Sequence, residues 1–489
     1  MLLYKRGADP DASLVQLLER ALTPPEYDLF IDRHLKIGVE WARVIEDKIR
    51  SADVVIPLLS DAALSSEMLE YEIEIALDQK LRYDRLRILP IRLGTVLPPG
   101  GGIGALIGHL QYSIWQDRGD NARLLAELVD AIDAGVEPGS DSATLPFPVR
   151  PTPSENPFYI VRSTDHDLAA ALQERETIIL VKGPRQVGKT SLVGQGVRLQ
   201  KNRGGRFVTT DFQRLASIHL ADADACYRML AADMARQLRF EYDFESEWTP
   251  LFGPGSNLHN FLRALVLAEP TPIAWFMDEA DRLFATPFAE DFFALVRSWH
   301  NAQSMDPDAD WGRLSIVITY ATEAHLFIQD LHQSPFNVGR QLFLQHFDFT
   351  QVQDLNERYG RPFGSVDQLT WLFELVEGHP FLTRRAMEHL LRTRDLKGLM
   401  ETAARDDGPF GDHLRRVLVS VTQLSGVTGA LRDSLSNVFL PDSRDLQRLI
   451  AAGILIRRPS GNYAIRGKLY RDYLASHIKA DTTSKKKLL

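Results

Sequence analysis

The segment Gly183–Ser191 constrains the fold of this chain more than any other stretch of its sequence. It reads Gly-Pro-Arg-Gln-Val-Gly-Lys-Thr-Ser and matches G-x-x-x-x-G-K-[ST], a pattern whose glycines let backbone N–H groups curl around phosphate oxygens. The apolar run 177–181 precedes it and a helical stretch follows, which is the context that the pattern requires. A chance glycine–lysine turn would not need either flank. The sequence therefore predicts an α/β domain with a strand, a phosphate-binding loop and a helix in succession.

The expected nucleotide contacts follow from the chemistry of this loop. Lys189 would reach the β- and γ-phosphates, and the Thr190 hydroxyl would ligate Mg²⁺. A second apolar run, 273–277, ends in Asp278 and Glu279, where Asp278 can hold Mg²⁺ through water and Glu279 can polarise an attacking water. We therefore expect ATP or ADP with Mg²⁺, and Thr190 and Asp278 as the metal ligands. The loop residues expected to contact the nucleotide are Gly183, Gln186, Val187, Gly188, Lys189, Thr190 and Ser191.

Length and local composition divide the chain into modules. Its 489 residues exceed what one hydrophobic core usually organises, and the proline-rich stretch 136–157 has neither helical nor strand periodicity. On both sides of that linker, short apolar runs alternate with amphipathic segments, which is typical of parallel α/β sheets. We expect an α/β domain at 1–135, the linker at 136–157, an α/β nucleotide-binding domain at 158–350, a helical lid at 351–420, a winged helix at 421–480 and a disordered tail at 481–489.

Composition argues against several other classes of protein. No apolar run is long enough to cross a bilayer, and the charged start of the chain does not fit a secretory signal. The single cysteine, Cys226, excludes an internal disulfide and fits a reducing compartment, so we expect a cytoplasmic protein. A net charge of -9 argues against a surface that binds nucleic acid mainly by counterion release.

Several phrases make residues 155–480 resemble the STAND class of AAA-like signalling ATPases. Besides the phosphate loop and Asp278-Glu279, they are Tyr159-Ile-Val-Arg162, Ser334-Pro-Phe-Asn-Val-Gly339 and Glu377-Gly-His-Pro-Phe-Leu382. In that class a Gly-x-Pro element touches the nucleotide from a helical lid, so the resemblance implies nucleotide contacts for Pro380 and Arg162. Considered alone, Gly378-His-Pro is typical of an ordinary helix stop. The resemblance also implies self-association of the ATPase modules and an activating trigger that the sequence does not name.

The region 442–478 is predicted to hold helices followed by a β-ribbon. The segments 454–458 and 463–466 form a predicted ribbon with its turn at Ser460-Gly-Asn462, which is the outline of a winged helix. One interpretation is a lid packed on the ATPase core, favoured by the apolar residues of this region and by the acidic net charge. The other is DNA binding through phosphate contacts from Arg444, Arg448, Arg457, Arg458, Arg466 and Lys468.

The predicted helix 66–80 carries one carboxylate in an unfavourable place. At about 100° per residue, Glu67, Glu70 and Glu74 fall on one arc, which predicts an ordinary solvated face. Glu72 falls within the apolar arc, where it must be paired, hydrogen-bonded or at the wall of a pocket, because burying it alone is costly. The alternative is a glutamate at the helix edge that reaches water.

The same region resembles a TIR (Toll/interleukin-1 receptor) domain over nearly all of residues 1–135, which implies a flavodoxin-like fold. The matching segments are Tyr4-Lys-Arg6, Phe30-Ile-Asp32, Gly38-Val-Glu-Trp41, Ser51-Ala-Asp53 and Ser66-Glu-Met-Leu-Glu-Tyr-Glu72. In catalytic TIR domains the glutamate at the last position is essential for cleaving NAD⁺ at its nicotinamide bond, and here it falls on Glu72. The NAD⁺ contacts that the resemblance implies are Lys5 and Arg6 at the diphosphate, with Asp32, Gly38, Trp41 and Ser66. For Trp41, core packing is an equally good interpretation.

The combined prediction is a TIR domain tethered to an ATP-regulated switch. By resemblance to such fusions, we expect a conditional NAD⁺ glycohydrolase of bacterial anti-phage defence, active when the ATPase modules assemble and bring TIR domains together. Two alternatives stay open. The TIR domain could be a non-catalytic module of a signalling scaffold, or the chain could be a winged-helix ATPase that acts on DNA.

Overall fold

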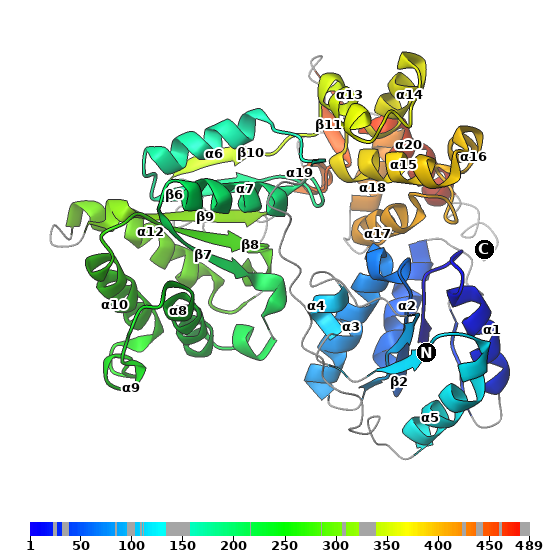
Figure 1. Ribbon diagram of the computed structural model, residues 1–489, viewed down its shortest axis with the longest axis horizontal. Coiled ribbons are helices and arrows are strands. Elements are labelled where there is room, and N and C mark those ends of the chain that lie inside the picture. The colour runs from blue at the N-terminus through cyan, green and yellow to red at the C-terminus, as the bar shows by residue number, and fades with distance from the viewer. Residues whose placement is uncertain are drawn as a thin grey trace. The chain divides into compact units, whose positions relative to one another are not determined.

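The computed structural model describes residues 1–22, 27–31, 39–83, 86–94, 103–107, 110, 112–133, 157–215, 217–284, 286–305, 310–321, 339–422, 427–436, 444–458 and 462–479. They form two compact units, which are described separately (Figure 1). The first unit comprises 1–156, 389–438 and 468–489, and the second comprises 157–388 and 439–467. The expected linker before Pro157, the tail 481–489 and the phrase 334–339 before Gly339 lie outside the described residues.

The N-terminal part of the first unit is built on a parallel sheet. Its strands are β1 (Leu2–Leu3), β2 (Val54–Leu59), β3 (Arg87–Ile88), β4 (Ile91–Leu93) and β5 (Ser113–Trp115). They follow the order β1-β2-β4-β5, with β3 also paired to β2. Ile31 bridges Leu2 in parallel, and Leu2 also pairs with Ile56 of β2, so the segment at Ile31 lies on the other side of β1. This arrangement has the flavodoxin-like order, which confirms the predicted fold.

Helices cover both faces of this sheet. One face packs against α1 (Asp11–Ala21) and α5 (Asn121–Asp133), and the other against α2 (Val39–Ser51), α3 (Glu67–Tyr83) and α4 (Ile103–Ile107). Successive residues of a strand point to opposite faces. In β2, accordingly, Val55 and Leu59 join the cluster under α2 and α3, whereas Ile56 and Leu58 join the cluster under α1 and α5. Burial on both faces explains the continuous apolar run of this strand.

The described C-terminal part of the first unit contains the helices α16 (Leu396–Thr402), α17 (Gly411–Thr422) and α18 (Val427–Leu435), and nearly all of α20 (Gly467–Lys479). Val419 of α17 belongs to the apolar cluster that α2 and α3 bury against the sheet. Helix α15 (Pro380–Thr393) passes from the second unit into the first. The boundary expected at 420 between lid and winged helix falls inside α17.

The second unit contains a five-stranded parallel sheet in the order β10-β6-β9-β8-β7. The strands are β6 (Ile178–Lys182), β7 (Arg206–Asp211), β8 (Ile273–Asp278), β9 (Leu314–Tyr320) and β10 (Arg340–Phe343). Figure 1 shows α6 (Ser163–Gln173) and α7 (Lys189–Asn202) on one face. The opposite face packs against α8 (Ala223–Leu238), α10 (Gly253–Ala268) and α12 (Ala289–Met305), with the short α9 (Phe244–Glu247) and α11 (Asp281–Phe284) nearby in sequence.

The remainder of the second unit is mostly helical. The helices α13 (Phe349–Arg358) and α14 (Val366–Val376) lead to α15, and α19 (Arg444–Ala451) precedes a ribbon of β11 (Leu455–Arg457) and β12 (Tyr463–Ile465). These two strands pair antiparallel, with Leu455 opposite Ile465, as the sequence predicts. Within the described ranges, no helix combines the length and the apolar character that a bilayer span requires.

Candidate functional site

The phosphate-binding loop runs from the carboxyl end of β6 to the amino end of α7. Gln186 and Gly188 have left-handed backbone conformations, with φ values of +59° and +101°. A Cβ atom at Gly183 would lie 2.9 Å from Cγ1 of Val187 and 3.0 Å from the carbonyl oxygen of Leu344. The loop therefore needs both of its glycines, Gly188 for its backbone conformation and Gly183 for space.

The first residues of α7 are placed as a phosphate site requires. Lys189 is buried, and its Nζ donates to the carbonyl oxygens of Gly183 at 3.4 Å and Pro184 at 3.2 Å, so the ammonium group lies within the loop. Thr190 and Ser191 are exposed in the first turn of the helix, where the macrodipole favours anions. The exposed Thr190 hydroxyl is available as an oxygen ligand, which suits the Mg²⁺ that accompanies a nucleotide.

A carboxylate, a hydroxyl and a backbone N–H meet where β8 and β9 end. The Thr319 hydroxyl of β9 donates to Oδ1 of the buried Asp278 and accepts the backbone N–H of Glu279 at 3.2 Å. Glu279 has a φ of +52°, a conformation that is costly for a residue other than glycine and is concentrated at functional sites. The sequence predicted both acidic residues but missed Thr319, because nothing in a continuous apolar strand marks one threonine as the partner of the neighbouring strand.

Asp281 is a further carboxylate that the sequence analysis missed. Its Oδ1 accepts the N–H of Ala321 at 2.6 Å, whereas Oδ2 is buried and makes no hydrogen bond to the described residues. Burial raises the pKa of Asp281 to about 6, Lys189 opposes this shift, and Glu279 adds to it. The spacing Asp-Glu-x-Asp was the available signal, because a short turn after β8 returns the third acidic residue to the same edge of the sheet.

The side chain of Arg162 supports the phosphate loop by donating to a backbone carbonyl oxygen of that loop. Its Nη1 donates to the carbonyl oxygens of Val187 at 2.8 Å and Gln345 at 3.3 Å, and its guanidinium lies 5.5 Å from the ring centroid of Phe347. A Cβ atom at Gly188 would lie 3.1 Å from Nη2 of Arg162. The structure thus places Arg162 against the loop, and its expected contact with the nucleotide stays a prediction.

Pro380 begins α15 after a tight helix stop. Glu377 and Gly378 both have positive φ values, +44° and +66°. A Cβ atom at Gly378 would lie 1.9 Å from the carbonyl oxygen of Phe347, whose N–H donates to the carbonyl of Gly378 at 2.9 Å. The Gly-His-Pro element is therefore a helix stop and also a close backbone contact with the segment that lies against Arg162. The predicted nucleotide contact of Pro380 is not tested by this geometry.

The turn between α19 and β11 lies against the phosphate-binding loop. A Cβ atom at Gly453 would lie 3.0 Å from two carbons of Pro184. Arg458 forms an ion pair with Glu377, and Arg448 pairs with an aspartate of its own helix at 3.2 Å. Two of the arginines that the DNA-binding alternative would use are thus engaged with carboxylates of the same unit.

The predicted NAD⁺-binding residues that the structure describes lie at the carboxyl edge of the first unit's sheet. Lys5 and Arg6 follow β1, and Ser66 precedes α3, which comes after β2. The Ser66 hydroxyl accepts the N–H of Leu69 at 3.3 Å, so Ser66 caps this helix. Glu72 is 4% exposed, and the burial expected from its place in the apolar arc is confirmed.

For three further residues predicted to bind NAD⁺, the side chains lie outside the described part of the structure. Asp32 and Gly38 lie outside the described residues. Trp41 falls on α2, but its side chain is also outside the described part of the structure, so neither core packing nor an NAD⁺ contact is tested.

Asp11 is a buried carboxylate that the sequence analysis did not single out. It begins α1 and is 0% exposed. Its Oδ1 accepts the backbone N–H of Lys5 at 3.3 Å, and the Ser60 hydroxyl also bonds to this carboxyl group. Burial raises the pKa of Asp11, and these hydrogen bonds oppose the shift. Asp11 therefore connects the ends of β1 and β2 at the edge where Lys5 lies.

Comparison with known families finds two matches along the chain. An AAA-like domain family matches residues 147–476, and a TIR domain family matches residues 1–129. The chain belongs to the AAA-like domain family. It carries a TIR domain fused to a P-loop ATPase, as the sequence predicted.

Individual relatives cover parts of the chain. An uncharacterized WD repeat-containing protein of Synechocystis sp. is 26% identical over 245 residues, which are 48% of this chain and 20% of that protein, so the chain spans about a fifth of its length. The ORC2 protein of Aeropyrum pernix in ADPNP–ADP complexes is 15% identical, with 67% of this chain and 94% of that chain covered and a TM-score of 0.39. AMPPCP-bound DnaA from Aquifex aeolicus is 13% identical, with 67% and 90% covered and a TM-score of 0.36.

The prediction that Glu67 lies on a solvated face of α3 in the TIR domain is wrong. This residue is 7% exposed, and its Oε1 lies 3.4 Å from Nδ1 of His413. Arg416 donates to the Glu67 carbonyl at 3.2 Å and lies 3.8 Å from the Glu70 carboxylate. A helical wheel considers one helix alone, whereas this face is covered by α17, which is distant in sequence.

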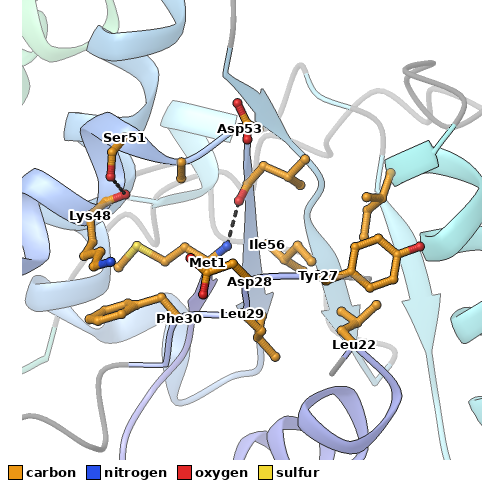
Figure 2. A pocket seen from close by; sticks show the side chains of 13 residues that line it. Met1, Leu22, Tyr27, Asp28, Leu29, Phe30, Lys48, Ser51, Asp53 and Ile56 are labelled. Atoms are coloured by element: carbon orange, nitrogen blue, oxygen red, sulfur yellow. Dashed lines mark hydrogen bonds between the residues drawn. The ribbon is translucent and has the colours of Figure 1, made fainter. Parts of the chain in front are cut away.

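A cavity of about 290 Å³ lies at the opposite edge of the TIR sheet, where β1 and β2 begin (Figure 2). There the amino group of Met1 donates to the carbonyl of Val54 at 2.8 Å, and the side chains of Phe30 and Lys48 contribute to the wall. The described lining includes none of the predicted NAD⁺-binding residues. We therefore assign this cavity no part in the candidate site.

Proposed function

We propose that this protein is an NAD⁺ glycohydrolase whose activity is controlled by its ATPase. The observation that carries the proposal is Glu72, a carboxylate buried on α3 at the position that the helical wheel and the TIR pattern select independently. Burying a carboxylate is costly unless it is paired, hydrogen-bonded or at the wall of a pocket, and functional sites are where such buried carboxylates concentrate. The helix α3, which carries Glu72, begins at the carboxyl edge of the parallel sheet, where α/β proteins bind ligands, and this also supports the proposal.

The proposed reaction is hydrolysis of the bond between C1′ of the ribose and the ring nitrogen of nicotinamide. The electron pair of this bond returns to the pyridinium nitrogen, so nicotinamide leaves as a neutral molecule. Water then adds its oxygen to C1′ and releases a proton to solvent, which gives ADP-ribose. The transition state resembles an oxocarbenium ion, and the carboxylate of Glu72 would stabilise it more than the ground state. Lys5 and Arg6 would bind the diphosphate.

The ATPase would set the state of the whole chain. ATP or ADP would bind at the phosphate loop with Mg²⁺ held by Thr190 and Asp278, and Glu279 would polarise the attacking water. A permanently active NADase would drain its host, so we propose that ATP-bound chains self-associate after an activating signal and bring TIR domains together. Anti-phage defence in the cytoplasm is the setting that we propose. The turn at Gly453 lies against Pro184 of the phosphate loop, and Arg458 pairs with Glu377. Both contacts support a lid rather than DNA binding for the C-terminal ribbon.

Glu72→Gln tests the proposed function most directly. The substitution keeps the size of the side chain and its hydrogen bonding but removes the charge. We expect normal folding and NAD⁺ binding, with hydrolysis slower by roughly 100-fold or more, because a charge that acts mainly in the transition state supplies several kcal/mol there. The measurement is nicotinamide release by the full chain, with ATP, before and after assembly.

The control for this test is Glu74→Gln, a half-buried position on the same helix outside the apolar arc. Glu70 is unsuitable because of its ion pair with Arg416. If both variants retain parental activity, Glu72 is not the catalytic carboxylate. If the parent itself releases no nicotinamide in any assembled state, the TIR domain is better explained as a non-catalytic scaffold.

A further inference from the structure

Helix α17 places a carboxylate on a predicted substrate-binding residue of the TIR domain. Oδ2 of Asp412 lies 2.5 Å from Nζ of Lys5, and the two side chains are only 6% and 14% exposed. Lys5 follows β1 at the carboxyl edge of the TIR sheet, and its ammonium group is the one proposed to bind the NAD⁺ diphosphate. A diphosphate bound to this ammonium group would therefore compete with Asp412 for it.

The same helix covers the beginning of α3. His413 and Arg416, one turn apart on α17, contact Glu67, and Arg416 also pairs with Glu70. Val419, a further turn along, is buried in the apolar cluster behind α3. The covered stretch of α3 lies between the Ser66 cap and Glu72. The contact is thus ionic near Lys5 and apolar towards the far end of α17.

A second C-terminal helix holds α17 in place. Nε2 of His413 lies 2.7 Å from the Tyr470 hydroxyl of α20, and Tyr473 of α20 donates to Asp406 at 2.7 Å. Helix α20 begins at Gly467, immediately after the β11–β12 ribbon. The segment that supports α17 is therefore directly continuous in the chain with the ribbon of the ATPase.

We infer that α17 is an internal competitor of the dinucleotide. Asp412 supplies to Lys5 the negative charge that the substrate diphosphate would supply, and the helix covers Glu67 and Glu70 in the first turn of α3, ahead of Glu72. The two anions exclude each other at Lys5, so NAD⁺ binds and is cleaved only after α17 has left. This inference rests on the proposed NADase function for its catalytic consequence, whereas the displacement of one anion by the other is a matter of binding alone.

Simple structural packing is the competing explanation, and it makes a different prediction. If α17 only completes the core of the first unit, loosening it lowers stability and leaves NAD⁺ affinity unchanged or weaker. If α17 competes with the substrate, loosening it strengthens NAD⁺ binding, because the fraction of molecules able to bind rises.

Arg416→Glu is the principal variant, because it places a negative charge against Glu67 and Glu70 without touching Lys5 or Glu72. The matched control is Arg405→Glu, a charge reversal in the same unit at an arginine that is 62% exposed and pairs with Asp407. A second variant, Asp412→Asn, removes the charge that faces Lys5 and keeps an amide oxygen for the buried Arg415. All are made in the full chain, and circular dichroism checks their folding.

Three measurements accompany each variant: hydrogen exchange of the amides at 66–72, the dissociation constant for NAD⁺, and nicotinamide release without a trigger. We expect faster exchange, NAD⁺ binding tighter by roughly tenfold and a similar rise in basal release for Arg416→Glu and Asp412→Asn. Arg405→Glu should match the parent.

Faster exchange with unchanged or weaker NAD⁺ binding overturns the inference, and so does unchanged exchange in both variants. Tighter NAD⁺ binding without any nicotinamide release, in variants and assembled parent alike, supports the inference and contradicts the proposed NADase function.

Discussion

The ATPase site and the candidate NAD⁺ site both lie at the carboxyl edge of a parallel sheet. The first is built mainly from backbone groups and the second from side chains. In the ATPase, the cradle is backbone, shaped by the left-handed Gly188 and the tightly packed Gly183, and Arg162 holds it by a bond to a carbonyl oxygen. In the TIR domain, the candidate site consists of side chains from separate segments, with Lys5 after β1 and Glu72 on α3.

This difference bears on how each site can be regulated. The shape of a backbone cradle is set largely by the local conformation of its loop, with support here from Arg162. A site made of charged side chains can be filled by other side chains of opposite charge, as Asp412 does at Lys5. A permanently formed nucleotide site suits a sensor of ATP, and a site that the chain itself can occupy suits an activity that must be silent until needed.

Lys189→Ala is the strongest test of this contrast and carries the largest expected effect. The substitution removes the ammonium group that donates to two carbonyl oxygens of the backbone cradle. We expect ATP to bind roughly 100-fold more weakly, about 3 kcal/mol, because charge-assisted bonds to phosphate are strong in a partly desolvated site. Isothermal titration of the full chain with ATP and Mg²⁺ measures it.

Lys201→Ala, at an exposed position near the end of the same helix, is the control and should bind ATP like the parent. Parental affinity in Lys189→Ala would mean that the cradle binds phosphate by backbone alone, or that the loop is not the nucleotide site. Nicotinamide release by the same variant without bound nucleotide would show that the two sites are not coupled.

The residues expected at the ATPase site can be named from the sequence because they are local. One contiguous loop and one strand end supply nearly all the expected contacts, and the structure brings them to one edge of the sheet. Thr319 and Asp281 were missed because their roles depend on which strand lies beside β8, and the order β6-β9-β8 cannot be read from a single apolar run.

The sequence predicts the TIR site less well because its surroundings are not local. The periodicity of α3 was enough to place Glu72 in the core, but not to see that α17 covers Glu67. Nothing in residues 66–80 encodes a helix found more than 300 positions later, at 411–422. Asp11 carries no signal in the sequence that marks it as buried, because its contacts are with Lys5 after β1 and Ser60 after β2.

A smaller effect is expected from Thr319→Val, which sharpens the contrast within the ATPase site. The substitution keeps the shape but removes the hydroxyl that joins Asp278 to the N–H of Glu279. We expect ATP binding near the parental value and hydrolysis slower by roughly tenfold, about 1.4 kcal/mol, because the strained Glu279 loses a positioning bond. Thr319→Ser restores a hydroxyl and should recover most of the rate, as measured by phosphate release at saturating ATP. An equal loss in both variants would assign the effect to packing.

The smallest effect concerns a feature that the two sites share, a buried carboxylate with a raised pKa at the edge of the sheet. Folding raises the pKa of Asp281 from 3.8 to about 6, so between these values the folded state holds a proton that the unfolded state has released. Its contribution to stability is present at low pH and is lost as the pH rises through about 6. Relative to Asp281→Asn, the parent should lose about 1 kcal/mol between pH 5 and pH 7.5. Urea unfolding followed by tryptophan fluorescence suits this measurement, because Trp275, Trp299 and Trp311 are fully buried in the same unit.

Asp11→Asn in the TIR domain should shift stability in the same direction, since burial raises the pKa of Asp11 also. A difference between parent and Asp281→Asn that is independent of pH, or that grows in the opposite direction, would mean that Lys189 and the N–H of Ala321 offset the burial of Asp281 completely.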